Sequence, residues 1–300
     1  MSESIVTSNL TKYYNAFTGL VDLDLSVSEG EIFGFLGPNG AGKTTTIRLL
    51  MGLIKPTRGS VFLMGHELRD SRLFVLKNIG YLPGDPGFYT DVTGNEYLVY
   101  LMKLRAGGRR HGAWHRLDEL KKEFNIDYKK KIAGYSKGIR QILGIIQAFM
   151  HGPRLIILDE PTSGLDPVMQ ERFYRLVERE KEEGRTVFLS SHNLNEVERI
   201  CDRVGFIKNG RLMTIERLGG RGSFAGRRVR LVVRDDTGAV LEGLDFLSDV
   251  TDPEVEGKTI RFLFRGDMND LVDWAGTVDL ADFTCEPPSV EDFFMSLYGE

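Results

Sequence analysis

Apolar residues occupy every second position in the first part of the chain, at Val21, Leu23, Leu25 and Val27. This period is the side-chain period of a β-strand that buries one face. The stretch 31–36 then runs into a glycine-rich turn, where a helix, Lys43 to Met51, is expected to open. We therefore predict strands between Ile5 and about Gly65, interrupted by this helix.

The spacing of apolar residues becomes that of an amphipathic helix between Glu96 and Ala148. One expected helix face contains Tyr97, Leu98, Leu101 and Leu104. A second expected face contains Leu117, Leu120 and Phe124. The pattern predicts a helical subdomain over about residues 90–150.

Strand and helix patterns alternate after this region. The apolar run Leu155–Leu158 predicts a buried parallel strand. Asp166 and Pro167 supply an N-cap and a first-turn proline for a helix that ends at Gly184. The pattern continues with a strand at Thr186–Ser190, a helix around Asn193–Ile200 and a hairpin closed by Asn209-Gly210.

The composition changes after Leu218, where glycines at 219, 220, 222 and 226 predict a loose, basic linker. Alternating apolar residues predict further strands at Val229, Leu231 and Val233 and at Ile260, Phe262 and Phe264. Ser289 would cap a final helix whose apolar face docks onto its own sheet, with an exposed partner face as the alternative. We expect a large domain, 1–218, and a small domain of strands and short helices, 219–300.

Charge and cysteine content limit the classes of partner. The chain of 300 residues has a formal net charge of -4, which gives no global attraction to nucleic acid or anionic membranes. Its two cysteines, Cys201 and Cys285, predict neither a disulfide framework nor a zinc site. No secretory signal and no stretch of about 18 apolar residues occur. We therefore expect a cytoplasmic protein without a membrane span.

The segment Gly37–Thr44 matches the pattern G-x-x-x-x-G-K-[ST] between an expected strand and an expected helix. Backbone N–H groups of such a loop point into one concavity, and the helix N-terminus adds partial positive charge. Lys43 would reach the β- and γ-phosphates of ATP, and the Thr44 hydroxyl would bind Mg²⁺. The expected phosphate-binding set is Gly37, Pro38, Asn39, Gly40, Ala41, Gly42, Lys43, Thr44 and Thr45. A glycine-rich turn without a ligand is the alternative.

Asp159 and Glu160 directly follow the buried run, at the carboxyl end of a strand, where ligands bind in open α/β sheets. Asp159 would hold Mg²⁺, directly or through water, and Glu160 would act as the general base on the attacking water. The alternative is that both acids only cap the next turn.

Several motifs follow one another in a characteristic order: Gly37–Thr44, Tyr135–Gln141, Leu155–Pro161, Ser163–Asp166 and Ser191-His192. With them the chain resembles an ATP-binding cassette (ABC) transporter ATPase over about Ile5 to Leu218. The resemblance implies an α/β fold, in which a P-loop NTPase domain carries antiparallel β and helical subdomains, with a small C-terminal α+β domain in addition.

The resemblance also implies roles for residues outside the phosphate loop. Ser136 and Gly138 would contact the γ-phosphate bound by the other subunit of a head-to-tail homodimer. His192 would orient the nucleophile beside the γ-phosphate, and Asp166 would couple the two sites. Tyr14 aligns with the aromatic residue that stacks on adenine, with Tyr13 as the competing choice.

The closing segment Pro287–Phe294 is similar to the end of ATPase subunits that serve ABC-2-type exporters. The family usually has glutamine where this chain has Gly84, which puts the usual contact to the membrane subunit in doubt, with Asp85 or a water as possible substitutes. The segment Gly84–Val92 remains the expected docking loop. Tyr135 and Lys137 also depart from the commoner leucine and glycine of the signature.

We therefore expect an ATP-hydrolysing subunit that powers a separate transmembrane permease from the cytoplasmic face of the membrane. The alternative is a soluble ABC-type ATPase acting on nucleic acid or ribosomes, and a third possibility is a nucleotide-sensing module without turnover. A single phosphate loop, the absence of long heptad repeats and the acidic charge count against a nucleic-acid partner. The basic stretch Lys103–Arg116 is interpreted as a solvated surface.

Overall fold

The computed structural model describes residues 2–14, 17–106, 111–218, 227–234, 237–244, 247 and 249–286. Contacts between residues divide the chain into two compact units, Met1–Glu216 and Arg217–Glu300. The expected domain boundary, after Leu218, lies two residues further along the chain. Each unit has a hydrophobic core of its own, so the two are described separately.

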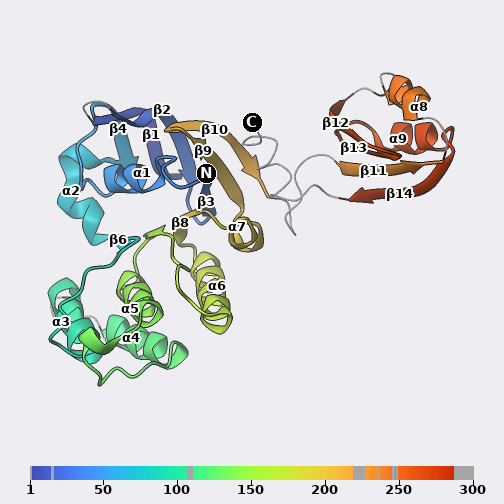
Figure 1. Ribbon diagram of the computed structural model, residues 1–300. Helices are drawn as coiled ribbons and strands as arrows, with labels where there is room; N and C mark the ends of the chain where they lie inside the picture. Colours follow the sequence, from blue (N-terminus) through green and yellow to red (C-terminus); the bar gives the residue numbers. More distant parts are fainter. Residues whose placement is uncertain are drawn as a thin grey trace. The chain divides into compact units, whose positions relative to one another are not determined.

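An antiparallel sheet with the strand order β2-β1-β4-β5 opens the first unit (Figure 1). Its strands are β1 (Glu3–Tyr14), β2 (Phe17–Ser28), β4 (Arg58–Leu63) and β5 (His66–Glu67). The predicted alternation along β2 is confirmed, because the apolar side chains of Val21, Leu23, Leu25 and Val27 are all buried.

A second, six-stranded sheet has the order β10-β9-β3-β8-β7-β6. It is built from β3 (Ile32–Leu36), β6 (Ile79–Leu82), β7 (Leu155–Asp159), β8 (Thr186–Ser191), β9 (Arg203–Lys208) and β10 (Arg211–Arg217). Strands β3, β7 and β8 are buried along their whole length and pair in parallel, as expected for a sheet covered on both faces. Their carboxyl ends therefore meet at one edge of the sheet.

Helices pack directly on these strands. Helix α1 (Lys43–Leu50) contacts β2 and β4 of the first sheet and β7 of the second, so one core joins the two sheets. Helices α6 (Pro167–Glu182) and α7 (Leu194–Ile200) contact β8. Asp166 caps α6 as predicted, but the helix ends at Glu182, before the left-handed Gly184, which has φ of 79°.

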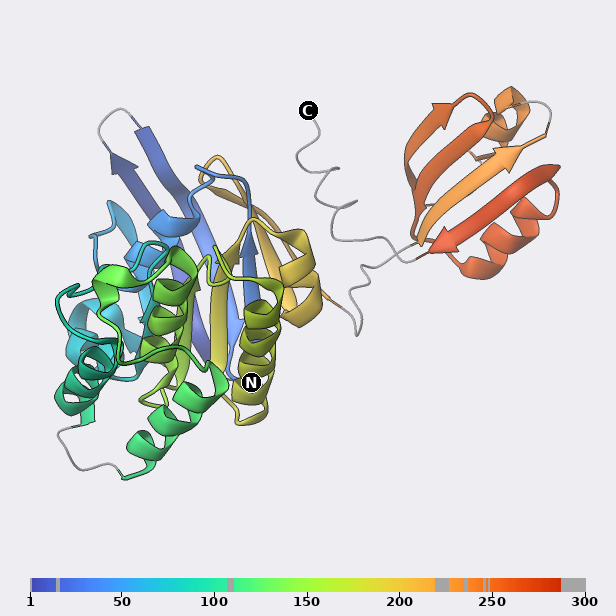
Figure 2. The same ribbon diagram turned by 60° about the horizontal axis from the view of Figure 1, so that its bottom comes forward.

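Helices α3 (Gly94–Ala106), α4 (His111–Glu123) and α5 (Lys137–Phe149) lie together at one end of the first unit, and Figure 2 shows them from below. The short helix η1 (Ile132–Gly134) precedes α5, and α2 (Leu68–Lys77) lies beside β4. The predicted face of α3 is wrong at Leu104, which is 64% exposed. Met102 is buried there instead, because the buried stripe turns toward α4 and α5.

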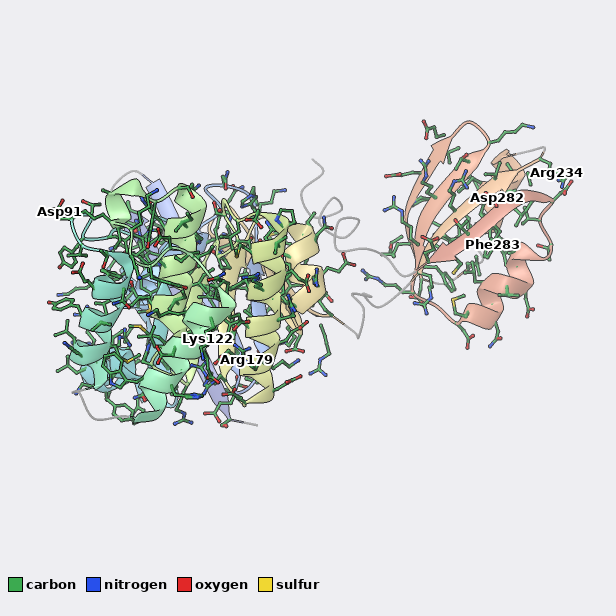
Figure 3. All side chains as sticks on the ribbon, turned by 90° about the horizontal axis from the view of Figure 1, so that it is seen from below. Asp91, Lys122, Arg179, Arg234, Asp282 and Phe283 are labelled. Carbon is green, nitrogen blue, oxygen red and sulfur yellow. The ribbon has the colours of Figure 1, made fainter. Side chains whose placement is uncertain are left out.

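Charged side chains tie α4 to its neighbours. Glu180 of α6 is fully buried and pairs with both Arg116 of α4 and Arg185. Arg116 Nε also donates to the backbone oxygen of Phe149, at the end of α5, over 2.8 Å. Lys122 of α4 and Arg179 of α6 are labelled in Figure 3, and Arg179 bonds Glu123 of α4 over 2.8 Å. These contacts fix the helices at one end of the first unit.

The second unit has a β-α-β-β-α-β order, with strands arranged β12-β13-β11-β14, which is the split βαβ topology. Its elements are β11 (Arg227–Val233), α8 (Thr237–Leu244), β12 (Val250–Glu256), β13 (Thr259–Phe264), α9 (Met268–Ala275) and β14 (Leu280–Glu286). The predicted strand pattern is confirmed, since Val229, Leu231, Val233, Ile260, Phe262 and Phe264 form the buried face. The final helix expected from Ser289 lies outside the described residues.

The other sheet face of the second unit carries ion pairs. Arg230 bonds Asp282 over 2.8 Å, and Arg261 bonds Glu256 over 3.1 Å. Figure 3 labels Asp282 and the partly exposed Phe283 on β14, which lies at one edge of this sheet. Within the described ranges of the chain, no helix is both long and apolar enough to cross a membrane.

Replacing Glu180 by glutamine should destabilise the first unit, because Arg116 and Arg185 would keep their charges in a largely buried place without the carboxylate. The expected loss is about 3–5 kcal/mol, the usual effect of removing one partner of a buried ion pair. In thermal unfolding followed by circular dichroism this corresponds to a drop of about 5–10 °C. Glu178→Gln, an exposed position on the same helix, is the matched control. An equal melting temperature for both variants would contradict the role given to Glu180.

Candidate functional site

The loop between β3 and α1 depends on glycine. Gly40 and Gly42 have φ of 81° and 114°, a conformation that other residues rarely adopt. A Cβ atom at Gly37 would lie 2.4 Å from the backbone oxygen of Ile207. The segment therefore folds into a tight loop whose exposed face, at residues 38–40, consists of backbone and two small side chains. Helix α1 begins directly after this loop, at Lys43.

The ammonium group of Lys43 lies inside the loop, and the side chain is only 5% exposed. Its Nζ donates to the backbone oxygens of Gly37, at 2.6 Å, and Pro38, at 3.1 Å. Burial lowers the pKa of Lys43, while the charges of Glu160 and Asp159 act in the opposite direction. A buried cation held by neutral carbonyl groups fits an anionic phosphate oxygen, which would be a stronger partner.

Asp159 ends β7 and is 2% exposed. The hydroxyl of Ser190 donates to its Oδ1 over 2.6 Å, and a Cβ atom at Gly84 would lie 3.3 Å from its Oδ2. The exposed Thr44 stands in the first turn of α1, one position after Lys43. A carboxylate and a hydroxyl are the hard oxygen ligands that Mg²⁺ prefers, so this donor set fits the ion.

Glu160 adopts a left-handed backbone conformation with φ of 48°, which is uncommon for a residue other than glycine. Its N–H donates to the backbone oxygen of Ser190 over 3.2 Å, and its own carbonyl accepts from Gln141 Nε2 over 3.2 Å. Such strain costs about 1–3 kcal/mol and persists only where the surroundings enforce it. The two backbone contacts help to maintain this conformation.

The side chain of Glu160 joins the other two expected catalytic residues. Its Oε1 lies 3.7 Å from Lys43 Nζ, and its Oε2 lies 3.2 Å from Nδ1 of His192. His192 follows β8 and is 57% exposed, whereas Glu160 is 27% exposed. The parallel sheet therefore brings together three residues that are far apart in sequence, with a carboxylate between a buried cation and an accessible imidazole.

Ser136, Gly138 and Asp166 belong to two neighbouring turns at the starts of α5 and α6. Ser136 caps α5, its Oγ accepting from Ile139 N over 3.3 Å. A Cβ at Gly138 would lie 2.5 Å from the carbonyl oxygen of Gly164, so these two turns pack closely. Asp166 caps α6, accepting from the N–H of Met169 over 3.0 Å. No hydrogen bond or ion pair among the described residues joins these three to Lys43, Glu160 or His192.

The expected adenine contact lies at the end of β1, where Tyr13 and Tyr14 are 44% and 40% exposed. A Cβ at Gly19 would lie 2.7 Å from Cε2 of Tyr14, and a Cβ at Gly42 would lie 2.9 Å from the carbonyl oxygen of Gly19. Gly19 therefore lies between the Tyr14 ring and Gly42 of the phosphate loop. The Lys12 ammonium group stands 5.3 Å from the centroid of the Tyr14 ring, so a base that stacks on this face would have to displace the Lys12 side chain.

Sequence reasoning missed Ser190 and Gln141 as supports of the acidic pair. Ser190 is fully buried at the end of β8, and its hydroxyl donates to Asp159. Gln141 is 2% exposed and donates through Nε2 to the carbonyl oxygens of Glu160 and Pro161. A polar residue at the end of an apolar strand was a usable signal for Ser190. Nothing in the sequence pairs Gln141 with a loop nineteen positions away.

Residues 20–163 match the ABC transporter family. The bacitracin transport ATP-binding protein BcrA of Bacillus licheniformis is 36% identical over 100% of this chain and 98% of its own length. Its namesake from Enterococcus faecalis is 40% identical over 71% of this chain and 69% of its own.

Solved structures agree with this match. The structure of an ATP binding subunit of an ABC transporter covers 71% of the chain, with 90% of its own residues, a TM-score of 0.67 and 32% identity. A dimeric ATP-binding cassette in a post-hydrolysis state, bound to ADP and Pi, covers 72% of the chain with 99% of its own residues, a TM-score of 0.66 and 26% identity.

Introducing a glutamine at Gly84 should strengthen the expected metal site, because the new side chain would start 3.3 Å from Asp159 Oδ2. Gly84→Gln is expected to lower the Mg²⁺ concentration for half-maximal ATP hydrolysis by about two- to fivefold, the effect of one additional polar contact. Gly84→Ala, which adds the Cβ without the amide, is the control. If Gln and Ala variants need the same Mg²⁺ concentration, the residue at this position does not reach the metal.

Proposed function

This chain belongs to the ATP-binding cassette transporter family, as the ATP-hydrolysing subunit of an ABC-2-type exporter, and from that premise we propose how its residues bind and cleave ATP. The family and fold expected from the ordered motifs are confirmed by the match over the whole chain and by the solved cassettes. The alternative, a soluble ATPase acting on nucleic acid or ribosomes, finds no support in these relatives.

The proposal rests on the position of the Glu160 carboxylate, which lies between Lys43 and His192. Lys43 and the backbone N–H groups of residues 37 and 39–45 bind the phosphates, and Thr44 and Asp159 would hold Mg²⁺. The metal, when bound, offsets the charge that develops on the phosphate oxygens. Glu160 accepts a proton from the attacking water, and His192 orients that water and the γ-phosphate. Tyr14 stacks on the adenine.

The site is completed by a second copy of the chain. Ser136 and Asp166 are exposed and cap two helices whose first turns are free to meet another molecule. The N-terminus of α5 also carries the partial positive charge of the helix dipole, which favours a phosphate. The dimeric cassette bound to ADP and Pi supports a dimer. We propose that the pair is head-to-tail, with Ser136 and Gly138 of each copy facing the nucleotide of the other.

The permease partner docks on the segment Gly84–Val92. Phe88 packs against Tyr97 of α3, with ring centroids 5.2 Å apart, which anchors the loop on the helical subdomain. Tyr89 and Tyr100 remain 69% and 52% exposed beside it. Exposed aromatic residues are enriched at protein interfaces, so this surface supports a protein contact that places the chain on the cytoplasmic face of a membrane. The second unit serves as an accessory domain.

The transported molecule is proposed from the relatives alone. The two relatives described above are named for bacitracin transport, and one of them aligns with the whole of this chain. We therefore propose a peptide antibiotic of the bacitracin type as the exported molecule, which the permease binds and this chain does not.

Glu160→Gln should bind ATP and lose turnover, because the phosphate loop is intact but the proton acceptor is gone. Hydrolysis is expected to fall by about 100-fold or more, and the ATP-bound variant should elute as a dimer in size-exclusion chromatography. Lys43→Ala, which loses the buried cation, should stay monomeric with ATP. Unchanged hydrolysis in Glu160→Gln would remove Glu160 from its role.

The same ATP-loaded Glu160→Gln chain should recover a multi-span membrane protein from native membranes in mild detergent, identified by mass spectrometry. Tyr89→Ala in that background is the matched control and should reduce recovery without changing ATP binding. Recovery of ribosomes or DNA-bound proteins alone would contradict the permease proposal.

Cells that express the chain with the recovered permease should tolerate more bacitracin than cells that express the Glu160→Gln variant with it. The bacitracin concentration that inhibits growth should be about fourfold or more higher for cells with the unchanged chain, because only this chain drives the permease by ATP hydrolysis. An unrelated aminoglycoside is the control compound. Equal inhibition of both strains by bacitracin would exclude it as cargo.

A further inference from the structure

Glu196 is a buried acid whose carboxyl group contacts the loop that carries His192. It lies in the first turn of α7 and is 1% exposed. The Ser191 hydroxyl donates to Glu196 Oε2 over 2.6 Å. The same hydroxyl oxygen accepts from the backbone N–H of Asn193 over 2.9 Å. Ser191 and Asn193, the two neighbours of His192 in the sequence, are therefore both connected to the Glu196 carboxyl group through the Ser191 hydroxyl.

A second contact connects Glu196 with the segment that follows Glu160. The Thr162 hydroxyl lies close enough to lower the pKa of Glu196, and Thr162 is 9% exposed. The N–H of Leu165 donates to the carbonyl oxygen of Thr162 over 3.1 Å, within the turn that leads to Asp166. Glu196 thus lies between the histidine loop and the turn that carries Glu160 at its start.

The surroundings of Glu196 place its ionisation near neutral pH. Burial raises the pKa of Glu196 to about 7, and the charge of Glu160 adds to this rise. The hydroxyls of Ser191 and Thr162 and the imidazole of His192 act in the opposite direction. Its Oε1 is buried and accepts no well-formed hydrogen bond from the described residues, which favours the protonated form.

Two further titratable groups face Glu196 from the helices packed around it. The pKa of Tyr174, on α6, is raised to about 12, first by burial and then by Glu196. Burial, with Glu196 second, also raises the pKa of the Cys201 thiol, at the end of α7. Arg199 stands 4.8 Å over the Tyr174 ring and is paired with Glu171 over 2.5 Å. Tyr174 and Cys201 stay neutral near pH 7, so neither of them adds a charge beside Glu196 there.

We infer that Glu196 is a positioning residue for His192, and that its ionised form holds the histidine loop in the place needed for ATP hydrolysis. The ionised carboxylate accepts a charge-assisted hydrogen bond from Ser191, which is stronger than the bond to a neutral carboxyl. Protonation weakens this anchor and lets His192 leave Glu160 Oε2. The inference rests on the role proposed for His192.

The test compares the full chain with Glu196→Gln, which resembles the protonated carboxyl in shape and charge. Turnover at saturating Mg-ATP is measured from about pH 6 to about pH 8.5. The ratio of wild-type to variant kcat should rise from near one at the acid end to about five- to tenfold at the alkaline end, with a midpoint near pH 7. KM for ATP should stay within about twofold.

The ratio reports the effect of the Glu196 carboxylate, because the two proteins differ only at this residue. Ser191→Ala should lose turnover at alkaline pH in the same way, since it removes the hydroxyl that transmits the charge. Glu178→Gln, an exposed acid on α6, should keep the wild-type profile. A ratio that does not change with pH, or a change in KM alone, would overturn the inference.

Thermal unfolding supplies a readout that does not need turnover. The pKa of Glu196 is raised in the folded chain, so its stabilising contribution is present at acid pH and is lost as pH rises through about 7. The melting temperature of Glu196→Gln minus that of the wild type should therefore increase by about 3 °C or more between about pH 5.5 and about pH 8. A constant difference would contradict a buried, titrating Glu196.

The His192→Ala variant distinguishes a failure of the role proposed for His192 from a failure of the inference about Glu196. If His192→Ala hydrolyses ATP at the wild-type rate, the proposed role of His192 fails, and the inference about Glu196 fails with it. If His192→Ala loses turnover while the Glu196→Gln ratio stays flat, only the inference is wrong and the proposed site stands.

Discussion

The ammonium group of Lys43 is nearly buried, and a buried charge without partners is costly by several kcal/mol. Its partners here are carbonyl oxygens of its own loop and the carboxylate of Glu160 at 3.7 Å. The loop conformation, the place of the acidic pair and the direction of α1 all have to satisfy this one group. Its two shortest contacts are to neutral carbonyl oxygens, and an anionic phosphate oxygen would be a stronger partner than either of them.

The sheet and the helical subdomain both act on Glu160. Ser190, at the end of β8, fixes its backbone N–H, and Gln141, on α5, fixes its carbonyl oxygen. Because α5 belongs to the helical group that also carries the exposed aromatic surface at Tyr89 and Tyr100, a displacement of that group acts on the backbone of Glu160 through Gln141. The left-handed conformation of Glu160 makes this residue sensitive to such a displacement, since only its neighbours maintain it.

Two acids beside the site have different surroundings. Asp159, at the end of β7, accepts a hydrogen bond from the Ser190 hydroxyl, and its charge acts on Lys43. Glu196 is buried to a similar degree, but one of its oxygens accepts no well-formed hydrogen bond from the described residues, and burial raises its pKa to about 7. The ends of β7 and β8 therefore lead to one acid of the expected metal site and to one buried acid with a raised pKa. The second unit, with its own core and ion-paired sheet face, shares none of these groups.

The sequence by itself determined the phosphate loop, the acidic pair and most strands, because these are local: glycine spacing, an apolar run and period-two alternation are read along the chain. It also determined the family, through the order of its motifs. Tertiary structure decided what depends on distant partners. Leu104 is exposed because the packing of three helices, and not its own helix period, sets the buried stripe. Gln141 supports Glu160, and Glu196 lies under His192, because parallel strands and α5 bring segments together that no local pattern connects.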